Sequence, residues 1–66
     1  MVRFCHRLRS LRKEKGLSQQ ALSERIGVSK SSVNMYERGE REPNFETLET
    51  IADFFDVDMD YLLGKS

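Results

Sequence analysis

Cysteine is nearly absent from this sequence, where Cys5 is the only one among 66 residues. A single cysteine cannot form a disulfide within the chain, which excludes the disulfide-stapled class of small secreted proteins. The pattern fits a reducing compartment, so we expect a cytoplasmic protein. The chain is also too short to close a second hydrophobic core, which predicts a single domain over residues 1–66.

Long apolar runs are missing as well. No stretch approaches the roughly 18 residues that a membrane-spanning helix needs, and the N-terminus lacks the apolar segment of a signal peptide. We therefore expect no membrane partner. Whether the chain is a complete protein or the N-terminal part of a longer one stays open from the sequence.

The residue sets that perform catalysis or bind metals are not found either. Cys5 and His6 are adjacent but have no further ligands with which to build a tetrahedral site. The acidic residues of the C-terminal half lack the spacing of a calcium loop; they include Asp53, Asp56, Asp58 and Asp60. There is no Gly-rich phosphate loop and no set of nucleophile, base and orienting residue. We expect no enzymatic activity, no metal and no cofactor.

Charge is present in quantity but segregated along the chain. Residues 1–38 contain nine basic and three acidic residues, whereas residues 39–66 contain two basic and eight acidic ones. Such a dipole can turn a phosphate backbone toward the basic half. The same segregation also fits two solvated faces without any partner, so charge alone does not decide between these interpretations.

Apolar spacing predicts five helices and no strand. Phe4, Leu8 and Leu11 recur at i, i+4 and i+7, which indicates a helix over about residues 3–15. Later helices are expected over about residues 18–26, 29–38 and from 44 onward, with a short turn after 58. The expected N-caps are Ser18, Ser29, Asn44 and Asp58. The expected helix stops are Gly16, Gly27, Gly39 and Gly64.

The link between the second and third helices is unusually short. Only Gly27 and Val28 separate the end of one from the cap of the next. A link of this length forces a sharp, nearly fixed crossing, which is the geometry of a helix-turn-helix spanning about residues 18–39.

The stretch QQALSERIGVSKSSVNMYERG resembles the helix-turn-helix of the phage-repressor and Cro-like family, also called the xenobiotic-response-element type. The flanking segments LRSLRKEKGLSQ and GEREPNFETLETIADFFDVDMDYLLG extend the resemblance over nearly the whole chain. It implies a compact five-helix, lambda-repressor-like fold and sequence-specific DNA binding, usually as a dimer and usually to repress transcription. It also implies an ion pair between Arg12 and Glu37.

Further positions take their expected roles from the same resemblance. Gly27 matches the turn glycine, Leu22 and Val33 match the positions that pack the two helices together, and Tyr36 matches a core-facing aromatic residue. Ser23 stands where the family more often has alanine, and it is small enough to preserve a close helix crossing.

By the same resemblance, the third helix is the expected recognition helix. A recognition helix presents its N-terminal residues to base edges. The expected base-reading residues are Lys30, Ser31, Asn34 and Met35. Asn34 could read adenine through two hydrogen bonds, Lys30 could read guanine, and Met35 could touch a thymine methyl group.

Phosphate contacts are expected around this helix. Gln19 matches a family position that touches phosphate at the start of the second helix, where amides and helix dipole favour anions. Ser29, Arg38 and Arg41 are the other expected contacts, and Ser29 also has a role as a cap. Glu40 and Glu42 in the same loop oppose close approach of the backbone.

Two further questions stay open from the sequence. Phe54, Tyr61 and Leu63 could form a dimer contact near the C-terminus, or they could simply complete a small core. The expected function is a transcriptional regulator, most simply a repressor of phage or bacterial type, whose partner is a double-stranded operator with an inverted repeat. The alternative is an antitoxin or protein-interaction adaptor that uses the same fold.

Overall fold

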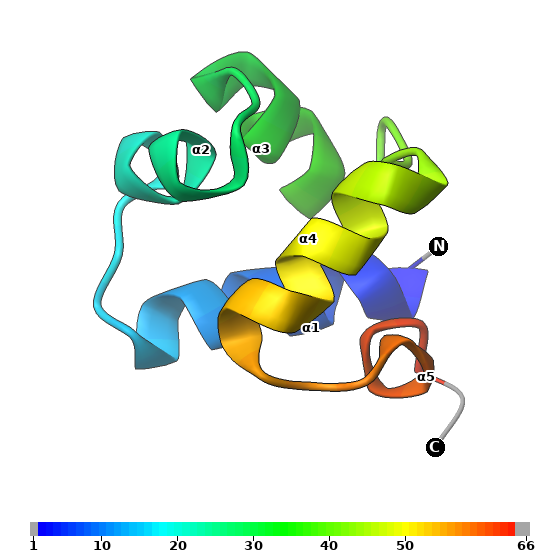
Figure 1. Ribbon diagram of the computed structural model, residues 1–66. Coiled ribbons are helices and arrows are strands. Elements are labelled where there is room, and N and C mark those ends of the chain that lie inside the picture. Colours follow the sequence, from blue (N-terminus) through cyan, green and yellow to red (C-terminus); the bar gives the residue numbers. More distant parts are fainter. Residues whose placement is uncertain (1, 65–66) are drawn as a thin grey trace.

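The computed structural model describes residues 2–64, which form five helices and no strand (Figure 1). The helices are α1 (Val2–Glu14), α2 (Gln19–Ile26), α3 (Lys30–Glu37), α4 (Phe45–Phe55) and α5 (Met59–Leu62). The all-α prediction is confirmed, and each helix lies within about one residue of its expected position.

Side-chain caps begin the last four helices as the sequence predicts. Ser18, Ser29, Asn44 and Asp58 have extended backbones, and each side chain accepts a hydrogen bond from the amide three residues later. Each cap satisfies an amide that has no partner within its helix, which stabilises the helix by about 1 kcal/mol.

The end of α4 differs from the glycine pattern of the other turns. Asp56 takes the left-handed conformation there, with φ 57° and ψ 47°, and its amide donates to the carbonyls of Ala52 and Asp53. Aspartate tolerates this region better than most residues other than glycine. The helix therefore stops where no glycine marks a stop.

One core lies between α1, α2, α3 and α4, and α5 closes it against α1 and α4. It is built from the apolar stripe of each helix, as amphipathic helices in a small domain require. Its members are Phe4, Leu8, Leu11, Leu22, Ile26, Val33, Tyr36, Leu48, Ile51, Ala52, Phe55 and Leu62. In Figure 1, α2 and α3 lie together at one end of this core, away from α5.

The aromatic residues near the C-terminus pack against the core and against one cation of α1 and one just after it. Phe54, Tyr61 and Leu63 are all half-buried. The Arg7 guanidinium carbon lies 4.2 Å from the centroid of the Tyr61 ring, and the Lys15 ammonium lies 5.6 Å from that of Phe54. These residues complete the core, and their dimer contact stays a prediction.

Candidate nucleic-acid interface

The turn between α2 and α3 fixes how the two helices cross. Gly27 adopts the left-handed conformation with φ 75°. Its amide and that of Val28 both donate to the carbonyl of Ser23, at 2.9 and 3.0 Å. Ser29 then starts α3 at once by accepting from the Ser32 amide at 3.1 Å. Since each residue of the link has a defined role, little freedom is left to the crossing angle.

Small and apolar side chains close this crossing. Leu22 and Val33 are fully buried, and Ser23 is 2% exposed. The Ser23 hydroxyl donates to the carbonyl of Gln20 at 2.6 Å, so its burial leaves no unsatisfied donor. Serine thus serves where the family more often has alanine.

The inward face of α3 is used for packing. Val33, Tyr36 and Glu37 are buried, and the Tyr36 ring meets Phe4 edge-on with centroids 6.5 Å apart. Because this face is anchored, the opposite face of the helix remains at the molecular surface.

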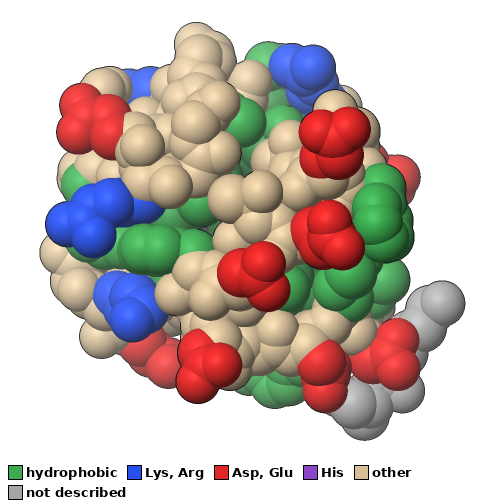
Figure 2. All heavy atoms as spheres, in the orientation of Figure 1, with side chains coloured by type: hydrophobic (Ala, Val, Ile, Leu, Met, Phe, Trp, Pro, Cys, Tyr) green, Lys and Arg blue, Asp and Glu red, His purple; other side chains and the backbone are tan. Residues whose placement is uncertain are grey.

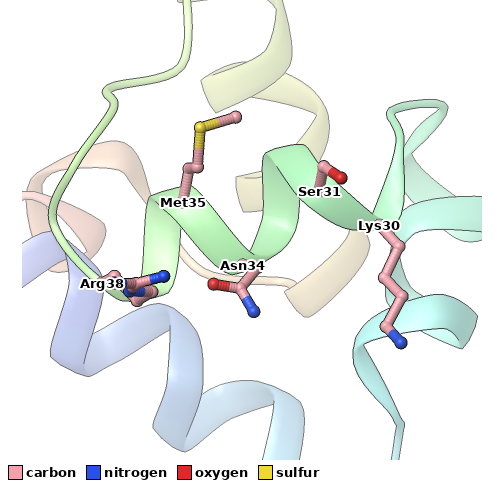
Figure 3. A pocket seen from close by; sticks show the side chains of 5 residues that line it. All are labelled: Lys30, Ser31, Asn34, Met35 and Arg38. Carbon is pink, nitrogen blue, oxygen red and sulfur yellow. The ribbon is translucent and has the colours of Figure 1, made fainter.

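That outward face forms a shallow, open hollow. It is lined by Lys30, Ser31, Asn34, Met35 and Arg38, all from α3 or its C-cap (Figure 3). Lys30, Ser31 and Arg38 are exposed, while Asn34 and Met35 are half-buried. The structure therefore brings all four expected base-reading residues to one surface, together with Arg38.

A largely buried ion pair joins this helix to α1. Arg12 Nε donates to Glu37 Oε2 at 2.6 Å, and Arg12 Nη2 donates to Glu37 Oε1 at 3.0 Å. Arg12 Nη1 also donates to the carbonyl of Leu17 at 2.8 Å. The ion pair implied by the resemblance is present in this geometry. The hydrogen bond to Glu37 raises the pKa of Arg12, against an opposing effect of burial.

Gln19 is partnered within the protein, which the sequence reasoning missed. Its Nε2 donates to Glu37 Oε1 at 3.2 Å, and its Oε1 accepts from Asn34 Nδ2 at 3.3 Å. These residues are 18 and 15 positions from Gln19 in the sequence, so no helical spacing could have indicated the contacts.

The other expected phosphate contacts lie around α3 with partners of their own. Ser29 caps the helix. Arg38 is exposed and pairs with Glu40, with Nη2 and Oε2 2.9 Å apart. Arg41 is exposed, and its Nη1 lies 3.4 Å from the Ser32 hydroxyl oxygen. The Arg38 side chain thus lines the hollow and is shared with Glu40, whereas Arg41 lies against Ser32 of α3.

Acidic side chains gather elsewhere on the molecule. Figure 2 shows several carboxylates spread over the face along which α4 runs. Exposed acidic residues of this region include Glu46, Glu49, Asp53, Asp56, Asp58 and Asp60. This surface would repel a phosphate backbone, whereas the surroundings of the hollow would attract it.

Other kinds of site receive no support from residues 2–64. Within that part of the chain no three His, Cys, Asp or Glu side chains gather as metal ligands would. None of its helices combines the length and the apolar content that crossing a bilayer requires.

Comparison with known proteins relates this geometry to regulators. The family model described as Helix-turn-helix matches residues 8–62. The chain is 41% identical over 64 residues to the HTH-type transcriptional regulator YqaE of Bacillus subtilis, covering 96% of this chain and 55% of that protein. It is 36% identical over 63 residues to the cryptic phage CTXphi transcriptional repressor RstR of Vibrio cholerae, covering 96% and 57%. The chain thus spans little more than half the length of these curated relatives.

Two solved structures share the fold closely. One is the P22 c2 repressor in complex with a synthetic operator, with a TM-score of 0.90, 35% identity and 96% of both chains covered. The other is SinR, a master regulator of biofilm formation, in complex with DNA. Its TM-score is 0.83 at 36% identity, with 91% of this chain and 97% of that chain covered.

Proposed function

The chain belongs to the Helix-turn-helix family, and on that basis we propose that it is a sequence-specific regulator of transcription that binds double-stranded DNA. The observation that supports this most strongly is the polar hollow on the outward face of α3, lined by Lys30, Asn34 and Arg38 among others. Major-groove recognition requires a helix whose inward face is packed rigidly against the protein and whose outward face is polar.

In the proposed complex, α3 lies in the major groove. Lys30, at the first position of the helix, donates to the O6 and N7 acceptors of guanine. Asn34 reads adenine, Met35 contacts a thymine methyl group, and Ser31 hydrogen-bonds to either kind of base edge. Each good bidentate contact would contribute about 1–3 kcal/mol of discrimination against the wrong base.

Backbone contacts would set the register of the domain. The first amides of α2 have no acceptor within their own helix and suit a phosphate oxygen. Arg41 and Arg38 would reach phosphates on the other side of the hollow, with Arg38 leaving Glu40 to do so. Such contacts strengthen binding to all sequences alike.

We further propose that two copies bind one operator. A helix of 8 residues is about 12 Å long, which is roughly four base pairs of groove. So short a site gives little sequence specificity. Two copies related by a two-fold axis would read two half-sites about one turn apart, which doubles the number of base pairs recognised. The dimer contact proposed for Phe54, Tyr61 and Leu63 would serve this arrangement.

Repression is the simplest regulatory outcome of this binding. Occupancy of an operator blocks access to a promoter without any chemical step, whereas activation needs a second contact with the transcription machinery. The protein would act in the cytoplasm, where bacterial and phage DNA lies. The alternative function as an antitoxin or adaptor has no observation of its own in its favour.

Selection of bound sequences from a pool of random duplexes tests the proposal. The expected result is enrichment of a two-fold symmetric motif whose half-sites lie about 10 base pairs apart. A variant with Lys30→Ala and Asn34→Ala should enrich no motif, or a shorter one, from the same pool. If the wild-type protein enriches no sequence even at low salt, the proposal is wrong.

A further inference from the structure

Four side chains from three helices form one continuous hydrogen-bonded chain at the edge of the hollow. Arg12 of α1 donates to Glu37 of α3, Glu37 accepts from Gln19 of α2, and Gln19 accepts from Asn34 of α3. The last member lies on the surface of α3 that the proposed function assigns to the bases. The first member, Arg12, is half-buried, and its partner Glu37 is 9% exposed.

The chemistry of Glu37 sets the direction of every bond in this chain. Both Glu37 carboxylate oxygens accept hydrogen bonds from Arg12, and a carboxylate has only acceptor oxygens to offer Gln19. Gln19 must therefore turn its Nε2 toward Glu37, which leaves Oε1 for Asn34. Asn34 must in turn present Nδ2 to that oxygen, because a carbonyl oxygen cannot donate.

The orientation of the Asn34 amide decides which base it can read. One of its two Nδ2 hydrogens is committed to Gln19, so one hydrogen and the Oδ1 acceptor remain for DNA. Figure 3 shows Oδ1 on the side of Arg38 and Nδ2 on the other side of the amide. One donor beside one acceptor matches the N7 acceptor and N6 donor of adenine. Guanine offers two acceptors at these places and would need both hydrogens.

We propose that Gln19 is a positioning residue that fixes the Asn34 amide for adenine, in place of the side-chain phosphate contact expected from the sequence. The inference rests on the proposed function and deepens it by assigning the specificity of one position. It also gives the ion pair of Arg12 and Glu37 a role in recognition, because their charges determine which way Gln19 faces.

A double-mutant cycle on the enriched duplex tests this assignment. Asn34→Ala first identifies the base pair whose identity it reads, where we expect a loss of roughly 5- to 150-fold in discrimination between adenine and guanine. Gln19→Ala should reduce this discrimination about 3- to 10-fold at the same base pair, and it should change the base preference at other positions of the duplex little. In the Asn34→Ala background, Gln19→Ala should change discrimination no further. The matched control is Gln20→Ala, one residue along α2, where the exposed side chain donates only to Glu24.

A side-chain phosphate contact would behave differently. Gln19→Ala would then weaken every duplex by the same factor, and this loss would add to that of Asn34→Ala. Either of those results overturns the inference, as does an unchanged base preference. If the wild-type protein enriches no motif at all, it is the proposed function that has failed.

A measurement without DNA tests the hydrogen-bonded chain from Arg12 to Asn34 independently of the proposed function. In spectra of the free ¹⁵N-labelled protein, Gln19→Ala should shift the side-chain amide signals of Asn34, whereas Gln20→Ala should leave them in place. Identical Asn34 signals in wild type and Gln19→Ala would contradict the hydrogen bond between Gln19 and Asn34, whatever the protein binds.

Discussion

Arg12 and Glu37, which are 25 positions apart in the sequence, meet through two hydrogen bonds of 2.6 and 3.0 Å. Their side chains are 12% and 4% exposed, so the pair is largely removed from water. Burying two charges is costly, and a pair of this kind fixes geometry more than it adds stability. Here it fixes α3 relative to α1.

Removal of the cation from this pair should destabilise the fold. Arg12→Ala leaves the Glu37 carboxylate buried without its counterion, and we expect a loss of about 3–5 kcal/mol in the free energy of unfolding. Urea denaturation followed by circular dichroism measures it. Arg9→Ala, at an exposed position of the same helix, is the control and should change stability by less than about 0.5 kcal/mol. Equal stabilities of the two variants would contradict the structural role.

The pH dependence of that loss follows from the sign of the Arg12 shift. The hydrogen bond to Glu37 raises the pKa of Arg12 in the folded state. A raised pKa of a base means that its contribution is fully present below the ordinary arginine value and disappears only above it. The difference between wild type and Arg12→Ala should therefore be the same at about pH 7 and about pH 9. A difference that shrinks over this interval would mean that another group controls the pair.

Substitution of the turn glycine should cost conformational strain alone. A Cβ at Gly27 would have no heavy atom within 4 Å, but φ is +75°, where side chains other than glycine are disfavoured. Gly27→Ala should thus lower the free energy of unfolding by about 1 kcal/mol, and Gly27→Asn by less. Urea melts measure both variants. A loss above about 3 kcal/mol, or no loss at all, would show that the turn differs from the one described.

Release of Arg38 should strengthen DNA binding without changing its specificity. Glu40→Gln removes the partner of Arg38 and one repulsive charge near the expected phosphates. We expect all duplexes to bind about two- to fivefold more tightly, with a steeper loss of affinity on addition of salt. Fluorescence anisotropy at several salt concentrations measures this, with Glu49→Gln on α4 as the control for net charge. Equal gains in affinity from both variants would mean that the change in net charge, and not the release of Arg38, causes the effect.

Local signals in the sequence predicted most of the helix boundaries. The caps at Ser18, Ser29, Asn44 and Asp58 were predictable because each acts on an amide three residues away. The end of α4 was not, because Asp56 takes a conformation that its identity permits but does not require.

Part of the candidate site depends on contacts between residues that are far apart in the sequence. The spacing after Ser29 placed Lys30, Ser31, Asn34 and Met35 on one face, and the structure confirms that they line one hollow. The pairing of Arg12 with Glu37 came from the family resemblance, since no helical period joins two helices. The bond between Gln19 and Asn34 could not be found from spacing, because it exists only once the Gly27 turn has brought α2 beside α3.

Titration of the ¹⁵N-labelled protein with its enriched duplex tests the central claim most directly. The account predicts that the largest amide shifts fall on residues 19–20, 30–38 and 41, around the hollow and the start of α2. The acidic face along α4, residues 46–56, should change little. If the largest shifts instead fall on α4 and α5 while the signals of α3 stay in place, the outward face of α3 is not the DNA-binding surface.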